Sequence, residues 1–97
     1  LKNRLSSMSP RILKAGNLVF WFHSYDVQIE SRPSIHVGRD AQNDVADAKI
    51  WLEPSIEIAR PGRSLSRTEL TTALRIVEEN LDRFREAWYA HKGKTNR

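Results

Sequence analysis

Short segments with the hydrophobic period of β-strands occupy the first sixty residues. Ile35 and Val37 alternate with polar residues, and Ile50 and Leu52 belong to a similar pattern further along the chain. Alternation with a period of two is typical of a strand with one buried face. Residues 18–23 are mostly apolar and aromatic on both faces, as expected for a central strand covered on two sides. The pattern predicts four strands and a short fifth one at an edge: residues 11–14, 18–23, 34–37, 46–52 and 55–59.

The last third of the chain has the period of an α-helix. Ser66 and Glu69 stand at the spacing of a capping box, in which each side chain accepts a hydrogen bond from the backbone N–H of the other residue. From residue 70 to Trp88, apolar residues recur at spacings of three and four and form one stripe. We expect a single helix from Ser66 to about His91, ended by Gly93.

Strands followed by one helix predict an α+β fold, a small antiparallel sheet of four to five strands with one long C-terminal helix packed across one face. Residues 24–33 are polar and include a proline, so we expect a loop there. A helix of about 25 residues is about 37 Å long, whereas four strands cover only about 20 Å. The helix should therefore overhang the sheet. Phe84, Trp88 and Tyr89 lie in the overhang, where either the basic N-terminal segment or a second chain would cover them.

Length and composition are those of one small globular domain. The chain has 97 residues, of which 39% are hydrophobic and 29% charged. This predicts a single domain over residues 10–92, between a loose N-terminal extension (1–9) and a basic C-terminal tail (93–97). The longest apolar run, residues 18–22, is too short to cross a membrane and no signal peptide is recognisable, so we expect a cytoplasmic protein without membrane contact. The chain has no cysteine, which excludes disulfides and thiolate sites, and no cofactor is expected.

Positive charge is concentrated near both ends of the chain, and the middle third is acidic. The formal net charge is +4. A further basic cluster, Arg60, Arg63 and Arg67, stands directly before the predicted helix. Basic segments bind phosphate through counterion release, so weak nucleic-acid contact is one interpretation. The other is that the basic ends only raise solubility.

The second face of the predicted sheet carries an uncommon set of side chains. Strand alternation places Trp21, Trp51, His36 and Lys49 there, together with His23. One helix cannot cover both faces, so these residues are predicted to form an interaction face. Aromatic rings on a sheet can stack bases while lysine holds phosphate. Alternatively, the two tryptophans pair across strands and pack on the predicted loop of residues 24–33 or on a partner subunit.

Two histidines on this face suggest two enzymatic hypotheses, a metal pair and acid–base cleavage of a phosphodiester. For cleavage, His36 and His23 would supply the base and the acid, and Lys49 would hold the phosphate. A metal site is not expected, because the other candidates, Asp26 and Asp47, do not stand at a diagnostic spacing. A single histidine on a strand is more often structural, so no catalytic residue is assigned.

Five segments of the chain resemble a known family: Pro10-Arg11-Ile12, Phe20 to Asp26, Arg32-Pro33-Ser34-Ile35-His36-Val37, Ala48-Lys49-Ile50-Trp51-Leu52, and Val77-Glu78-Glu79-Asn80 through Trp88. The chain is similar to the small bacterial domain of unknown function numbered forty-one-sixty. Members have a short Pro-x-Ile segment, an aromatic strand ending in Ser and Asp, a Pro-Pro-His-Val-His-Val strand, a further aromatic strand, and a closing helix that ends in Trp. The resemblance covers nearly the whole chain from Met8 onward.

The resemblance implies a protein partner rather than a defined reaction. The family has no settled activity, and its genes are often neighbours of small genes thought to form toxin–antitoxin-like pairs. The first histidine of its His-Val-His motif is Ser34 here, whereas the second is His36. A metal or two-histidine mechanism built on that motif is therefore not expected for this protein.

The predicted function is that of a non-enzymatic interaction module, which binds a small partner protein or forms a homodimer, in the setting of a toxin–antitoxin-like pair. Its contacts would be the overhanging end of the helix and the tryptophan face. The alternative is a nucleic-acid-binding or RNA-cleaving toxin that uses the sheet face around His36.

Overall fold

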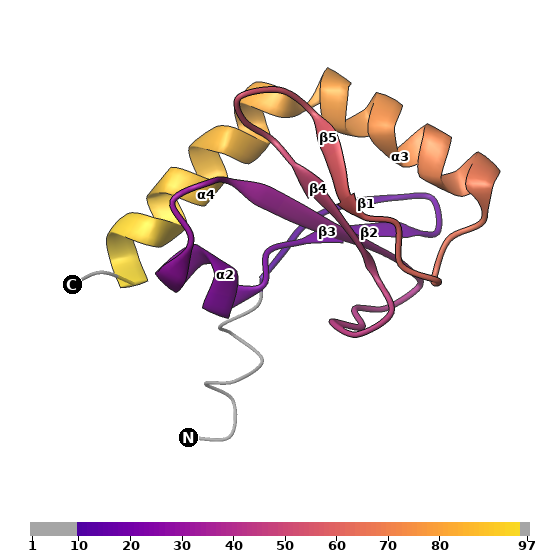
Figure 1. Ribbon diagram of the computed structural model, residues 1–97, viewed down its shortest axis with the longest axis horizontal. Coiled ribbons are helices and arrows are strands. Elements are labelled where there is room, and N and C mark those ends of the chain that lie inside the picture. The colour runs from indigo at the N-terminus through magenta and orange to yellow at the C-terminus, as the bar shows by residue number, and fades with distance from the viewer. Residues whose placement is uncertain (1–9, 96–97) are drawn as a thin grey trace.

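The strand-forming segments form one antiparallel sheet, shown in Figure 1 with the helices that pack on it. The structure is a computed structural model, which describes residues 10–95. The strands lie side by side in chain order, so every connection joins two neighbours. The elements are β1 (Arg11–Ala15), β2 (Leu18–Trp21), α2 (Ser24–Ile29), β3 (Ser34–Arg39), β4 (Ala48–Trp51), β5 (Glu57–Arg60), α3 (Arg67–Glu79) and α4 (Leu81–Thr95).

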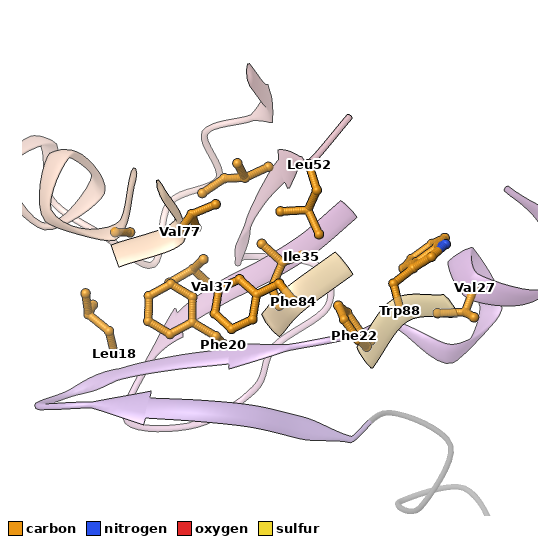
Figure 2. Packing of buried hydrophobic residues seen from close by; sticks show 12 residues of the cluster. Leu18, Phe20, Phe22, Val27, Ile35, Val37, Leu52, Val77, Phe84 and Trp88 are labelled. Atoms are coloured by element: carbon orange, nitrogen blue, oxygen red, sulfur yellow. The ribbon is translucent and has the colours of Figure 1, made fainter. Parts of the chain in front are cut away.

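The register of the central strands places the alternating apolar positions on one face of the sheet. Phe20 lies opposite Val37, and Ile35 lies opposite Ile50. Helices α3 and α4 pack on this face and complete the core seen in Figure 2. Each large apolar side chain buried in this way stabilises the fold by about 1.5–3 kcal/mol. The core consists of Leu18, Phe20, Phe22, Val27, Ile35, Val37, Ile50, Leu52, Ala73, Val77, Phe84 and Trp88.

The predicted α+β fold is confirmed, but the single helix expected at its C-terminus is two helices. The capping box at the start of α3 is present, with Ser66 and Glu69 accepting from each other's backbone N–H. α3 ends at Glu79 and is capped by Asn80, whose side-chain amide donates to the carbonyl of Ile76. α4 begins at the next residue, and Figure 1 shows that the two helices meet at an angle. The pair therefore follows the sheet instead of running straight past it.

The predicted overhang is wrong, because the chain covers Phe84 and Trp88 with its own residues. Both side chains are fully buried. Phe84 stacks on Phe20 with 5.7 Å between ring centroids, and Trp88 meets Phe22 edge-on at 5.6 Å. Of the three residues expected in the overhang, only Tyr89 is exposed, at 47%. Phe84 and Trp88 therefore cannot form an interaction surface in this fold.

A short helix, α2, stands where the sequence predicted a loop, and it extends the platform beneath α4. Val27 reaches from α2 into the core near Trp88, as Figure 2 shows. Lys92 on α4 donates from Nζ to the backbone carbonyls of Val27 and Glu30, each at 2.9 Å. Such contacts satisfy carbonyls that the end of a helix leaves unpaired. A helix of six residues is not stable alone, so these tertiary contacts hold it.

Several predicted boundaries differ from the structure. β4 is shorter than predicted, and β5 begins and ends later. α4 continues to Thr95, so Gly93 lies inside the helix instead of ending it. The predicted extension, residues 1–9, and the last two residues of the predicted tail, 96–97, lie outside the described residues. Within residues 10–95, no helix is long and apolar enough to cross a membrane.

Candidate functional site

The sheet face away from α3 and α4 carries the catalytic candidates, and we term it the reverse face. Trp21 lies opposite His36, and His36 lies opposite Lys49, on three neighbouring strands. His23 follows β2, and its ring centroid is 5.7 Å from that of His36. The structure therefore brings together the three residues that the cleavage hypothesis requires.

One carboxylate, that of Asp26 on α2, joins His36 to Lys49. His36 Nε2 donates to Asp26 Oδ2 at 2.9 Å, and Lys49 Nζ lies 3.3 Å from the same oxygen. Lys49 also donates to both carboxylate oxygens of Glu30, at 3.1 Å each. Burial raises the pKa of Asp26, but the hydrogen bond from His36 and the positive charge of Lys49 outweigh burial and hold that pKa below its usual 3.8. These contacts fasten α2 to the sheet.

The ring nitrogens of His36 are enclosed, whereas Nε2 of His23 bonds an exposed carboxylate at the surface. His36 is 2% exposed, and its Nδ1 is buried without a hydrogen-bond partner among the described residues. His23 Nε2 is hydrogen-bonded to Asp44 Oδ2 at 3.2 Å, and its Nδ1 is also buried. A general acid or base must come within hydrogen-bond reach of the proton it transfers. The enclosure of His36 favours a structural role for that residue. Residues 10–95 contain no group of three His, Cys, Asp or Glu side chains that could hold a metal ion.

A second carboxylate, Asp47, is fully buried on the reverse face. It accepts hydrogen bonds from Trp21 Nε1 at 2.9 Å, the backbone N–H of Asn43 at 2.9 Å and the Ser64 hydroxyl at 2.5 Å. A Cβ on Gly38 would lie 2.2 Å from an Asp47 carboxylate oxygen, so only glycine fits at that point of β3. In the sequence, Asp47 was considered only as a metal candidate. Its hydrogen bonds were not predictable, because two of its three partners, Ser64 and Trp21, stand 17 and 26 residues away.

Both tryptophans of the predicted interaction face are engaged within the chain. Trp21 is 2% exposed, because the loop that ends in Asp47 holds its indole. Trp51 is partly buried, with the guanidinium of Arg32 4.3 Å and the ammonium of Lys49 4.7 Å from its ring centroid. β3 lies between their strands, so the predicted cross-strand pair of tryptophans does not form. The expected interaction face is therefore wrong for Trp21, His36 and Lys49, which the chain itself covers.

The predicted basic contacts lie at the end of β5 and the start of α3. Arg60, Arg63 and Arg67 are all exposed. Arg60 donates from Nη2 to the backbone carbonyls of Asp44 and Asp47, at 3.1 and 3.3 Å. Among the described residues, Arg63 and Arg67 form no ion pair. The cluster therefore leaves positive charge at the surface, without an enclosed site that the structure assigns to phosphate.

An exposed strand edge and a partly apolar groove near it were not predicted as a site. β5 is the last strand of the sheet, and all four of its residues are exposed. Ile58 pairs with Ile50 and so faces the helix side, yet it remains 42% exposed. A groove of about 350 Å³ lies between the segment before β5 and α3, lined by Ile56, Leu74, Arg75 and Glu78. We term β5, Ile56 and Leu74 together the β5 surface.

The other edge of the sheet is less open than β5. Arg83 on α4 donates from Nη2 to the backbone carbonyl of Ile12 in β1, at 3.2 Å. Three of the five residues of β1 are partly buried, whereas all four residues of β5 are exposed. Alternation in the sequence cannot show which edge stays uncovered, because that depends on where the helices pack.

The family of the chain follows from comparison with known proteins. The model of a domain of unknown function (DUF4160) matches residues 17–89. This match covers well over half of the chain, and the protein belongs to the DUF4160 family. The resemblance identified in the sequence is thereby confirmed, although its first segment, residues 10–12, precedes the matched range. No curated protein and no solved structure shows significant similarity to the chain.

Proposed function

We propose that this protein is an interaction module that binds another protein chain by strand addition at β5. The observation that supports the proposal is the combination of an uncovered strand edge with apolar side chains on its helix side. Edge strands present unpaired N–H and C=O groups and are templates for pairing with another chain. In strand addition, main-chain hydrogen bonds provide affinity and pockets for alternate side chains provide specificity.

The β5 surface combines an uncovered strand edge with apolar side chains beside it. Ile58 is apolar and 42% exposed, although it faces the side of the sheet that the helices cover elsewhere. The groove lined by Ile56 and Leu74 is open to an apolar side chain of an added strand. The sequence analysis leaves two partners open, the small protein of a toxin–antitoxin-like pair and a second copy of the chain, and either would use this edge.

RNA cleavage around His36 has less support. The Nε2 atom of His36 is bound to Asp26, and its Nδ1 is enclosed. The test is incubation of a defined RNA with the wild type and with His36→Ala. We expect intact RNA in both reactions. Cleavage by the wild type that is lost in the variant would overturn the non-enzymatic proposal.

Strand addition is tested with a phage-displayed library of short peptides selected on the wild-type protein. We expect the selected peptides to bind the wild type and to lose at least about tenfold in affinity for Ile58→Lys, because a charge replaces the exposed apolar contact. The matched control is Ile29→Lys, since Ile29 on α2 is 59% exposed and lies outside the β5 surface. A library that yields no binder, or binders equally weakened by both variants, would contradict the proposal.

A further inference from the structure

We propose that the strand added at β5 is β5 of a second copy of this chain, paired antiparallel across a two-fold axis perpendicular to the sheet. This inference rests on the proposed strand addition and names its occupant. The sequence of β5, Glu57-Ile58-Ala59-Arg60, has opposite charges at its two ends. In an antiparallel pair of such strands, each Glu57 lies opposite the Arg60 of the second copy.

A bulge in β5 makes this register possible. Residues opposite each other in one continuous sheet must project from the same face, whereas residues three apart in a regular strand project from opposite faces. Glu57 pairs with Trp51 and Arg60 pairs with Lys49, while Ala59 has no partner on β4. The extra residue therefore places Glu57 and Arg60 on the same face, the reverse face.

Charge disfavours two of the other symmetric registers. A pair centred on Glu57 would oppose two carboxylates, and a pair centred on Arg60 would oppose two guanidinium groups. Like charges directly opposite each other are destabilising in an antiparallel pair. Pro61 follows Arg60 and has no N–H to donate, so pairing ends with the strand. Only the register that joins Glu57 to Arg60 matches charge across the axis.

Both charged side chains can accept a new partner. Glu57 receives one hydrogen bond from Arg32 Nη2 at 2.7 Å, and its side chain remains 57% exposed. Arg60 uses only Nη2 for its hydrogen bonds to described residues, so Nη1 and Nε can reach a carboxylate. On the other face, Ile58 of each copy lies near the axis. Apolar contact on one face and two ion pairs on the other therefore act together.

Light scattering after size exclusion, over a concentration series, tests the inference on the full chain. We expect the mass to rise from 11.2 kDa toward twice that value as concentration increases. Glu57→Arg and Arg60→Glu should each raise the dimer dissociation constant by roughly tenfold or more, because both symmetric pairs become repulsive at once. An equimolar mixture of the two variants should restore dimerisation as a heterodimer, since opposite charges then face each other again.

The control is Glu86→Arg, the same charge reversal on an exposed residue of α4, which should leave dimerisation unchanged. Circular dichroism establishes that each variant is folded. A wild type that stays monomeric at all concentrations, or single variants whose mixture fails to dimerise, would overturn the inference. Peptide binding that depends on Ile58 in a monomeric wild type would leave the proposed strand addition standing and remove only the second copy as its occupant.

Discussion

Truncation of Asp26 tests whether the polar cluster on the reverse face is structural. In Asp26→Ala, His36 Nε2 loses its acceptor although His36 is only 2% exposed. A buried polar group left without a partner costs about 1–3 kcal/mol. Lys49 keeps both carboxylate oxygens of Glu30 as partners, so its charge stays paired. We therefore expect the free energy of unfolding to fall by about 1–3 kcal/mol.

Urea denaturation followed by tryptophan fluorescence measures this loss at neutral pH. The matched control is Asp44→Ala, because Asp44 also pairs with a histidine, His23, but its side chain is 59% exposed. The control should cost less than about 1 kcal/mol, since exposed pairs contribute little. Equal losses in the two variants would refute the argument that burial decides the cost.

The carboxylate of Asp26 also makes the unfolding free energy depend on pH, with a sign that follows from its pKa. The pKa of Asp26 in the folded protein lies below the usual 3.8. Its stabilising contribution is therefore complete above the pKa of the unfolded chain and is lost as the pH falls through the folded pKa. The difference in unfolding free energy between wild type and Asp26→Ala should shrink below about pH 4.

Two further substitutions test the second carboxylate and the helix cap. Gly38→Ala places a Cβ 2.2 Å from the Asp47 carboxylate. Thermal unfolding should show a melting temperature at least about 8 °C lower than that of the wild type. An unchanged melting temperature would contradict the close packing of Gly38 against Asp47. The hydrogen bond from Arg39, followed by that from the Ser66 backbone, lowers the pKa of Glu69 to about 2. The loss of stability caused by Glu69→Gln should therefore be complete above pH 4.5, the usual pKa of a glutamate, and should vanish as the pH falls toward 2. A loss independent of pH would show that the carboxylate charge is not involved.

Local patterns in the sequence were sufficient for the strands and for the start of the helix. Alternation around Ile35 and Ile50 follows directly from the pleat of a strand with one buried face. The spacing of Ser66 and Glu69 predicts a cap because the contacts involved are only three residues apart. These elements depend on neighbours in the chain, and the structure agrees with them.

Elements held by distant contacts were not predictable in this way. The stripe from Leu74 to Trp88 continues through Asn80 without a change of period, so the break between α3 and α4 leaves no mark in the apolar pattern. α2 depends on Val27 in the core and on Lys92 from the far end of the chain. The reverse face is also covered through contacts between residues distant in the sequence. For this reason its residues were predicted to be available for a partner.

A concentration series of amide nitrogen–proton NMR spectra of the wild type tests the use of the β5 surface most directly. We expect the amides of residues 57–60 and of the groove around Leu74 to shift as concentration rises. The indole N–H of Trp21 should stay fixed, because Asp47 holds it inside the chain. Shifts centred on Trp21 and His36, with β5 unchanged, would contradict the account.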